Sequence, residues 1–224
     1  MNTESSQIKV LLVDDHPLLR QGITQLINQE KDLMVCGEAE DAKEALQVIA
    51  STKPDIVISD ISLKEASGIE LVKDIKIQYP KLPVLMLSMH DESVYAQRAL
   101  RAGAGGYITK QEATEKVLIA LRRVLSGQVY LSEALGTKML NQMVGNRSEV
   151  NSSPMSALSD RELEVFGLIG EGYGTREVAE KLHLSVKTIE SHRAHIKEKL
   201  NLKTANELVH QAVQWIQTEM AGCN

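Results

Sequence analysis

Three carboxylates, a hydroxyl and a lysine stand at the ends of short apolar runs in the first half of the chain. Asp14 and Asp15 follow the first run, and Asp60 follows the third. Ser88 lies at the end of the fourth run, and Lys110 follows the fifth. Clustered carboxylates repel one another unless a cation neutralises them, and oxygen ligands with open positions suit Mg²⁺. A carboxylate can also act as a nucleophile, while a lysine and a hydroxyl can contact phosphoryl oxygens. These residue types therefore predict a site for phosphoryl chemistry.

These side chains meet only if the apolar runs are strands of one sheet. Between residues 1 and 126, near-continuous apolar runs alternate with segments of helical spacing, which is typical of a parallel sheet covered on both faces. We therefore predict a doubly wound, five-stranded parallel α/β domain, whose ligands bind at the carboxyl ends of its strands. The predicted strands are Lys9–Val13, Met34–Ala39, Ile56–Ser59, Val84–Met89 and Gly106–Ile108, and the predicted helices are His16–Gln29, Asp41–Ser51, Gly68–Gln78, Val94–Ala102 and Ala113–Ser126.

The second half of the chain has no strand pattern and predicts an all-α domain of four helices. Capping-box sequences open the first helix at Ser159 and the fourth at Thr204. We predict a domain over residues 1–126, a linker over 127–154 with a connecting helix at Ser132–Val144, and a second domain over 155–218. The turn-rich stretch Gly145–Pro154 is flexible by composition. The four predicted helices are Ser159–Gly170, Thr175–Leu182, Ser185–Leu200 and Thr204–Trp215.

The composition excludes several classes of protein. The chain has 224 residues, of which 43% are hydrophobic and 25% charged, as is ordinary for a folded protein. The apolar runs are far shorter than the roughly 18 residues of a membrane span, and the first residues lack the apolar core of a secretory signal. The two cysteines, Cys36 and Cys223, lie far apart, which fits a reducing compartment and excludes a disulfide framework. We therefore expect a cytoplasmic protein that makes no contact with a membrane.

The predicted helix Ser185–Leu200 concentrates basic side chains in a domain that is acidic overall. Residues 155–224 carry 8 basic and 10 acidic side chains, which is unusual for a nucleic-acid binder. Helical spacing nevertheless gives this helix a face of small and polar residues flanked by basic ones, which suits a DNA major groove. A solvated face of an ordinary helical bundle is the alternative. The residues on this face are Lys187, Glu190, Ser191, Ala194 and Lys197.

Four stretches of the first half resemble the receiver domain of two-component response regulators. They are Leu11–Pro17 (LLVDDHP), Asp55–Asp60 (DIVISD), Leu87–His90 (LSMH) and Gly106–Lys110 (GYITK). The resemblance implies that Asp60 accepts a phosphoryl group from a phosphohistidine of a sensor histidine kinase.

The same resemblance implies the roles of the residues around Asp60. Asp15, Asp60 and the backbone carbonyl of Ser62 would bind Mg²⁺, with Asp14 beside them. Ser88 and Tyr107 would form a switch pair, and Lys110 would contact the phosphoryl group. One stretch departs from the family pattern, because Leu63-Lys64 stands where many receivers have Met-Pro.

Three stretches of the second half resemble the LuxR-type helix-turn-helix. They are Leu158–Val165 (LSDRELEV), Glu171–Ala179 (EGYGTREVA) and Leu184–Arg193 (LSVKTIESHR). Over nearly its whole length, the chain thus resembles the NarL/FixJ group of response regulators. The resemblance implies binding to double-stranded DNA as a homodimer, with dimerisation through the fourth helix. The residues expected to contact DNA are Thr175, Lys187, Thr188, Glu190, Ser191, Arg193, Ala194 and Lys197, and those expected to dimerise are Leu208, Ala212 and Trp215, which could equally be plain core.

We therefore predict a phosphorylation-switched, sequence-specific DNA-binding transcription regulator that is not an enzyme beyond self-catalysed phosphoryl transfer and autodephosphorylation. Two rivals remain. The first is an aspartyl-phosphate hydrolase, which would need an acid two residues after the nucleophile, where this chain has Ser62. The second is a receiver whose helical domain binds a protein partner, which the net acidic charge of that domain keeps open.

Overall fold

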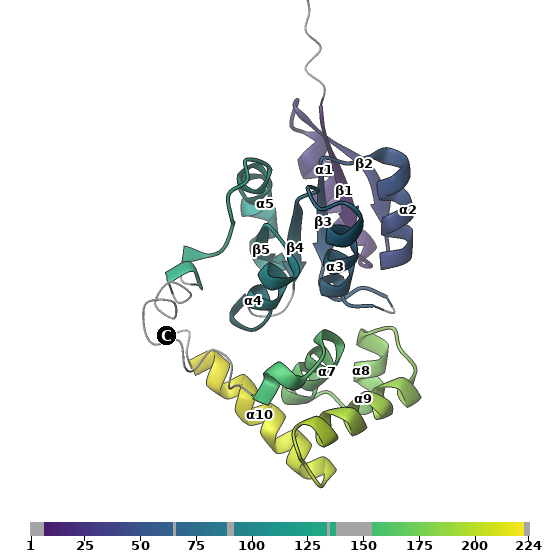
Figure 1. Cartoon of the computed structure of the whole chain (residues 1–224), viewed down its shortest axis with the longest axis vertical. Helices are drawn as coiled ribbons and strands as arrows, with labels where there is room; N and C mark the ends of the chain where they lie inside the picture. Colours follow the sequence, from purple (N-terminus) through teal and green to yellow (C-terminus); the bar gives the residue numbers. More distant parts are fainter. Residues whose placement is uncertain (1–6, 65, 89–91, 134, 138–153, 222–224) are drawn as a thin grey trace, which may run out of the picture. The chain divides into compact units, whose positions relative to one another are not determined.

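The computed structural model describes residues 7–221 apart from 65, 89–91, 134 and 138–153. The chain divides into two compact units, Met1–Ser132 and Glu133–Asn224 (Figure 1). The first unit is α/β, and the described part of the second is helical. The predicted fold class is therefore confirmed in both units.

The α/β unit has a five-stranded sheet in the order β2-β1-β3-β4-β5, and every neighbouring pair of strands is parallel. Val13 pairs with Ser59, and Ser88 pairs with Thr109, so these strands end at the same edge of the sheet. The strands are β1 (Ile8–Val13), β2 (Leu33–Ala39), β3 (Ile56–Asp60), β4 (Val84–Ser88) and β5 (Gly106–Thr109), and the helices are α1 (Pro17–Asn28), α2 (Ala42–Thr52), α3 (Gly68–Gln78), α4 (Glu92–Ala102) and α5 (Lys110–Leu125).

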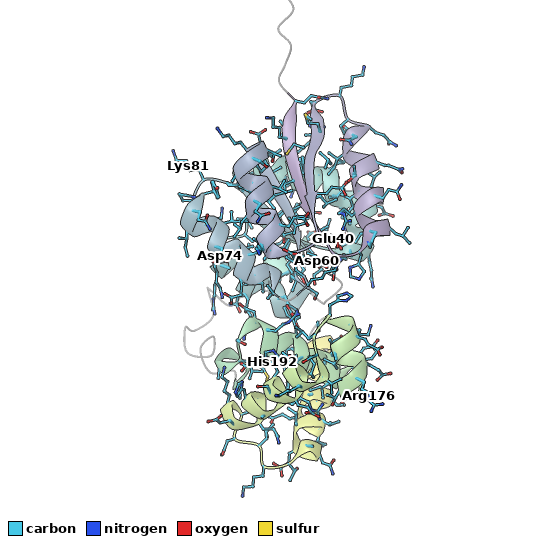
Figure 2. The ribbon with its side chains drawn as sticks, turned by 90° about the vertical axis from the view of Figure 1, so that its right-hand side faces the viewer. Glu40, Asp60, Asp74, Lys81, Arg176 and His192 are labelled. Carbon is cyan, nitrogen blue, oxygen red and sulfur yellow. The ribbon has the colours of Figure 1, made fainter. Side chains whose placement is uncertain are left out.

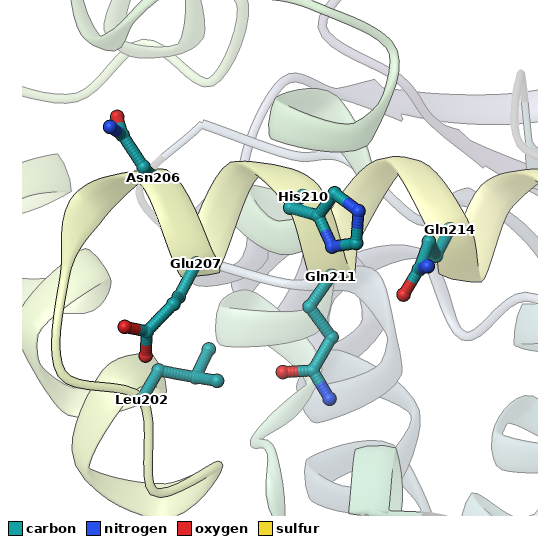
Figure 3. Close-up of a pocket in the computed structure, with 6 residues that line it drawn as sticks. All are labelled: Leu202, Asn206, Glu207, His210, Gln211 and Gln214. Carbon is teal, nitrogen blue, oxygen red and sulfur yellow. The ribbon is translucent and has the colours of Figure 1, made fainter.

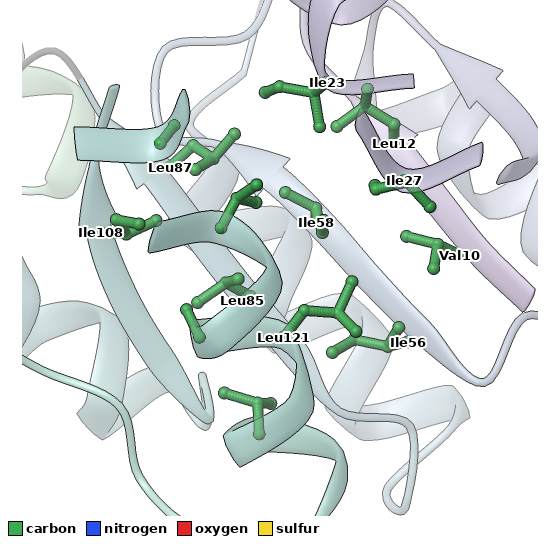
Figure 4. Packing of buried hydrophobic residues seen from close by; sticks show 14 of the residues in the cluster. Val10, Leu12, Ile23, Ile27, Ile56, Ile58, Leu85, Leu87, Ile108 and Leu121 are labelled. Carbon is green, nitrogen blue, oxygen red and sulfur yellow. The ribbon is translucent and has the colours of Figure 1, made fainter. Parts of the chain in front are cut away.

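The core of this unit forms because alternate strand residues face helices on opposite sides of the sheet. Val10, Ile58 and Leu85 from three neighbouring strands pack with Ile27 of α1 and Leu121 of α5 (Figure 4). Burying a side chain of this size stabilises the fold by about 1.5–3 kcal/mol. The intervening residues Leu11, Val57 and Met86 of the same strands are also buried, on the opposite face, where α2 and α4 flank α3. With both faces covered, only the ends of the strands are open to a ligand.

Every predicted strand and helix outside the linker is present, with small shifts at its ends. Helix α5 begins at Lys110, three residues before the predicted start. The prediction placed the start too late because the first turn of the helix is polar and carries no apolar pattern. The α/β unit also continues past residue 126, since the backbone of Tyr130 pairs with Gly105 and Tyr107 beside β5. Met89, the predicted last residue of the fourth strand, lies outside the described residues.

From residue 154 to residue 221, the helical unit has a short 3₁₀ turn and four α-helices. Ser159 and Glu162 form the predicted capping box, with each side chain accepting a backbone N–H of the other residue. Thr204 caps the last helix, which continues past the predicted end at Trp215. The elements are η1 (Pro154–Ala157), α7 (Asp160–Gly170), α8 (Thr175–Lys181), α9 (Val186–Lys199) and α10 (Ala205–Ala221).

Helices α7 and α10 approach each other closely in this unit. A Cβ atom on Gly170 would lie 2.5 Å from the carbonyl oxygen of Ala212, so only glycine fits there. The rings of Phe166 and Trp215 lie 5.5 Å apart between their centroids. Leu208 is fully buried in the same contact, so α10 is part of the core of the unit.

Only part of the predicted connecting helix Ser132–Val144 can be compared with the structure. Residues 133 and 135–137 are helical, and the remainder, with the predicted linker up to residue 153, lies outside the described residues. None of the helices in the part of the chain that the structure describes has the length and apolarity that crossing a membrane requires.

Candidate functional site

The carboxyl edge of the sheet gathers acidic side chains around one lysine. Asp14, Asp15 and Asp60 are buried there, although they come from the ends of two different strands. Lys110 Nζ lies 2.6 Å from Asp60 Oδ2 and 2.8 Å from Asp14 Oδ2, and its side chain is only 3% exposed. The lysine therefore bridges two of the three carboxylates. Figure 2 shows Asp60 at this end of the α/β unit.

The electrostatics of this pocket are dominated by burial. Burial raises the pKa of Asp60 from an ordinary 3.8 to about 7, because Lys110 offsets the loss of hydration only in part and Asp14 adds repulsion. For Lys110, burial lowers the pKa, but the carboxylates of Asp60 and Asp14 outweigh it and the net shift is upward. A second cation at this edge would stabilise the ionised form of Asp60.

The donor atoms of the pocket fit a divalent cation. One ligand atom from each of Asp14, Asp15, His16 and Asp60 can be chosen such that all lie within 4.8 Å of one another. Three of these four residues are buried carboxylates, the oxygen donors that hard cations such as Mg²⁺ prefer.

The loop between β3 and α3 is held against the backbone of Asp60. The N–H of Gly68 donates to the carbonyl of Ile61 at 2.5 Å. A Cβ atom on Gly68 would lie 1.9 Å from the carbonyl oxygen of Asp60, so this position requires glycine. Leu63, which departs from the family pattern, is buried. The end of the loop at Gly68 is therefore packed closely against the end of β3.

The predicted switch residues lie on β4, which is next to β3, and on β5, which is next to β4. Ser88 ends β4 and is fully buried, in register with Thr109 of β5. Tyr107, two residues earlier on β5, is also fully buried. Both positions are thus packed inside the unit, near the end of the sheet that carries Asp60.

Two features of this edge were not anticipated from the sequence. The ring of His16 lies over the carboxylates, with Nδ1 2.7 Å from Asp15 Oδ1; its place directly after Asp14-Asp15 was the available signal. In addition, Lys64 forms an ion pair with Glu40, which also binds Arg20 at 3.1 Å. Figure 2 labels Glu40 at the same end of the α/β unit as Asp60.

Helix α9 presents the predicted polar face, although not all of its residues are equally accessible. Lys187, Glu190, Ser191 and Ala194 are exposed, whereas Thr188, Arg193 and Lys197 are partly buried, as is Thr175 at the start of α8. The hydroxyl of Thr188 lies 2.7 Å from that of Ser185, the cap of α9. Ile189 and Ile196 are buried on the opposite face, so the amphipathic prediction for this helix agrees with the structure.

Three acidic residues of the helical unit are buried on α7. Asp160, Glu162 and Glu164 are all buried. Glu162 Oε2 lies 2.6 Å from Nζ of Lys199, and Glu164 Oε2 lies 2.6 Å from Arg161. Two of these three buried acids are therefore neutralised by basic side chains of the same unit.

Two of the predicted dimer residues, Leu208 and Ala212, are fully buried in the helical unit, which agrees with the alternative that they are plain core. Trp215 is partly buried against Phe166. The exposed side of α10 instead carries Val209 and a shallow groove (Figure 3). The groove is lined by Leu202, Asn206, Glu207, His210, Gln211 and Gln214.

An acidic pocket at the end of a doubly wound sheet, joined in one chain to a helix-turn-helix unit, defines a signal-receiving regulator with a DNA-reading output. Residues 10–122 match the response regulator receiver domain, and residues 156–212 match the bacterial regulatory proteins of the luxR family. The chain therefore belongs to the two-component response regulators of the NarL/FixJ group. Proteins of this kind are phosphorylation-regulated, DNA-binding transcription regulators, and so is this one.

Known relatives span nearly the whole chain. The oxygen regulatory protein NreC of Staphylococcus aureus (strain MRSA252) is 39% identical over 211 residues, which cover 92% of this chain and 97% of NreC. RcsB of Salmonella enterica serovar Typhimurium, solved bound to promoter P1flhDC in the presence of the phosphomimetic BeF3−, is 27% identical with a TM-score of 0.61, over 92% of this chain and 98% of that one. A structure of two RcsB dimers bound to two parallel DNAs is 28% identical with a TM-score of 0.56, over 92% and 97%.

Proposed function

We propose that Asp60 is the phosphoryl acceptor of this response regulator and that a sensor histidine kinase is its donor. The observation that carries the proposal is the ion pair between buried Asp60 and Lys110 at the open edge of the sheet. In the transfer, an Asp60 oxygen bonds to phosphorus while the bond from phosphorus to the donor breaks. Lys110 moves its positive charge to the phosphoryl oxygens, where it stabilises the added negative charge.

We further propose that Asp15, Asp60 and the backbone carbonyl of Ser62 hold Mg²⁺, with Asp14 beside them. The buried oxygen donors support this proposal. When bound, the ion neutralises charge on the carboxylates and the phosphoryl group. Ser88 on β4 and Tyr107 on β5 would respond to the acyl phosphate. The phosphoryl group would stay on the carboxylate of Asp60 and would not pass to a substrate. We therefore propose that the protein is not an enzyme beyond self-catalysed phosphoryl transfer and autodephosphorylation.

Intact mass after incubation with a small acyl-phosphate donor tests the acceptor. With Mg²⁺ the wild type should gain one phosphoryl adduct, and Asp60→Asn should gain none. Asp55→Asn makes the same change at the other end of β3, on an exposed residue, and should still be phosphorylated. An adduct on Asp60→Asn, or equal yield in EDTA, would contradict the proposal.

We propose that α9 reads a DNA major groove, with exposed Glu190, Ser191 and Ala194 facing base edges and Lys187 a phosphate. The support is the exposed polar face of α9 and the promoter-bound RcsB relative. Thr175, Thr188, Arg193 and Lys197 are less accessible and are proposed to contact phosphates at the edge of the interface. A DNA-binding regulator must share a compartment with its DNA, so we propose that the protein is cytoplasmic.

A DNA-binding experiment distinguishes DNA reading from a protein-binding output. The phosphorylated protein first selects duplexes from a random pool, and its affinity for the selected duplexes is then measured. Affinity should fall steeply with salt, because phosphate contacts release counterions. Lys187→Glu should weaken binding by about tenfold or more, whereas Lys203→Glu, an equally exposed lysine outside α9, should have a much smaller effect. Failure to enrich any duplex, or equal losses in both variants, would favour the protein-partner alternative.

We propose that the regulator binds paired half-sites as a homodimer. The DNA-bound RcsB dimers support this, and the exposed side of α10, which includes Val209, is the available surface. Trp215 would contribute only through its exposed part. Sedimentation of the phosphorylated protein with a two-half-site duplex should give two chains per duplex, and Val209→Asp should reduce this to one.

A further inference from the structure

The backbone of His16 is fixed at the mouth of the acidic pocket. Its N–H donates to Asp14 Oδ1 at 2.8 Å, and Pro17 follows it as the first residue of α1. Both constraints limit where the imidazole ring can go, although the side chain itself is 58% exposed. The ring is therefore anchored at its base and accessible at its edge.

From this position the ring nitrogen Nδ1 faces the carboxylates. It lies 2.7 Å from Asp15 Oδ1, 3.1 Å from Asp14 Oδ1 and 4.0 Å from Asp60 Oδ2. Donor atoms bound at about 2.0–2.2 Å to one ion lie no more than about 4.4 Å apart. These separations are already close to those of a coordination sphere, so only small side-chain movements would complete one.

We propose that His16 is a nitrogen ligand that gives this pocket a second, transition-metal binding mode. The inference rests on the proposed metal site but concerns its selectivity. Mg²⁺ takes oxygen donors and leaves imidazole aside, whereas imidazole suits Zn²⁺ and Co²⁺. Mg²⁺ would be held by the carboxylates without the ring, whereas Zn²⁺ or Co²⁺ would also be held by His16, and the ring would then limit access to Asp60.

Cobalt makes the nitrogen ligand visible, because the d–d absorption of Co²⁺ reports the donors and geometry around the ion. The full chain at pH 8 would receive Co²⁺ stepwise, with absorption spectra and equilibrium dialysis giving the spectrum, stoichiometry and Kd. The variants are His16→Gln and His195→Gln. His195 is a matched control because its side chain is also 58% exposed and lies on α9. Calorimetry with Mg²⁺ on the same three proteins measures the oxygen-only mode.

The proposal expects His16→Gln to weaken Co²⁺ binding by about tenfold or more and to change its spectrum, while His195→Gln does neither. Mg²⁺ affinity should stay within about twofold in all three proteins. Nitrogen splitting in the electron paramagnetic resonance of bound Cu²⁺ should also disappear in His16→Gln. Melting curves would establish that His16→Gln remains folded, as the exposure of the ring leads us to expect.

Each outcome decides the proposal. The same Co²⁺ affinity and spectrum in wild type and His16→Gln would overturn it while leaving the Mg²⁺ site intact. Loss of both Co²⁺ and Mg²⁺ binding in His16→Gln would also overturn it, because the histidine would then serve the pocket as a whole. A wild type that binds neither ion would overturn both this proposal and the proposed Mg²⁺ site, although phosphorylation of Asp60 could still be measured separately.

Discussion

Replacing Lys110 with methionine isolates the charge that balances the acidic pocket. The change keeps the length of the side chain but removes a charge that lies 2.6 Å from Asp60 and 2.8 Å from Asp14. Breaking a buried ion pair from one side costs about 3–5 kcal/mol, because the remaining charges lose their compensation. We expect the metal-free α/β unit to lose about that much free energy of unfolding at pH 8.

The loss should depend on pH in a defined direction. Burial already raises the pKa of Asp60 to about 7, and removing Lys110 raises it further. The folded variant therefore binds a proton that the unfolded chain releases, and its stability increases as the pH falls. The difference from wild type should shrink between pH 8 and pH 6 by at most about 1.4 kcal/mol per pH unit.

Urea unfolding in EDTA, followed by far-ultraviolet circular dichroism, measures this difference. Trp215 is the sole tryptophan and lies in the helical unit, so its fluorescence serves as an internal control whose midpoint should not move. Lys116→Met removes an exposed ion pair with Glu112 on the same helix α5 and should have a much smaller effect. A Lys110→Met variant as stable as wild type at pH 8, or a loss that is equal at pH 6 and pH 8, would refute the reasoning.

Three other substitutions, together with Gly22→Ala as a control, test the pocket and the packing. Burial raises the pKa of Asp60 to about 7, so the free energy of unfolding of the metal-free wild type should decline as the pH rises from about 4 to about 7. Asp60→Asn should remove this decline. In urea unfolding at pH 8, this variant should therefore be more stable than the wild type. Gly68→Ala would place a Cβ atom 1.9 Å from the Asp60 carbonyl oxygen; it should abolish the phosphoryl adduct seen by intact mass, and an unchanged yield would show that the loop can shift freely. Gly170→Ala would place a Cβ atom 2.5 Å from a carbonyl oxygen of α10, which should lower the stability of the helical unit by about 1–3 kcal/mol in Trp215 fluorescence. Gly22→Ala, which meets no atom within 4 Å, should cause no loss by circular dichroism; equal losses from both alanines would argue against a packing cause.

The fold and the pocket were predictable because parallel strands align their carboxyl ends. Once the apolar runs are read as strands, Asp14, Asp60 and Lys110 must meet at one edge of the sheet, and in the structure they do. The capping boxes were equally accessible, since they depend on residues three positions apart. The start of α5 was misplaced because Lys110 begins the helix directly after the strand, without a loop.

Other features depend on contacts that a linear pattern does not specify. The apolar stripe of α10 was visible in the sequence, but the stripe does not say which surface covers it, and Leu208 turned out to face α7 within the same chain. Similarly, charge counting treats all acids alike, whereas Glu162 and Glu164 are buried and paired. The contact of Lys64 with Glu40 joins two loops 24 residues apart, and no local spacing predicts it.

The order in which the pocket residues occur along the chain has a consequence for protein synthesis. Asp14 and Asp15 come near the start of the chain, Asp60 in the middle of the α/β unit, and Lys110 at the start of α5. At roughly 5–20 residues per second, a ribosome takes on the order of 5–20 s to reach Lys110. A nascent chain that already contains Asp60 therefore still lacks the charge that balances the pocket. The balanced pocket around Asp60 can form only when the receiver domain is nearly complete, which is still before the helices of the second unit have been translated.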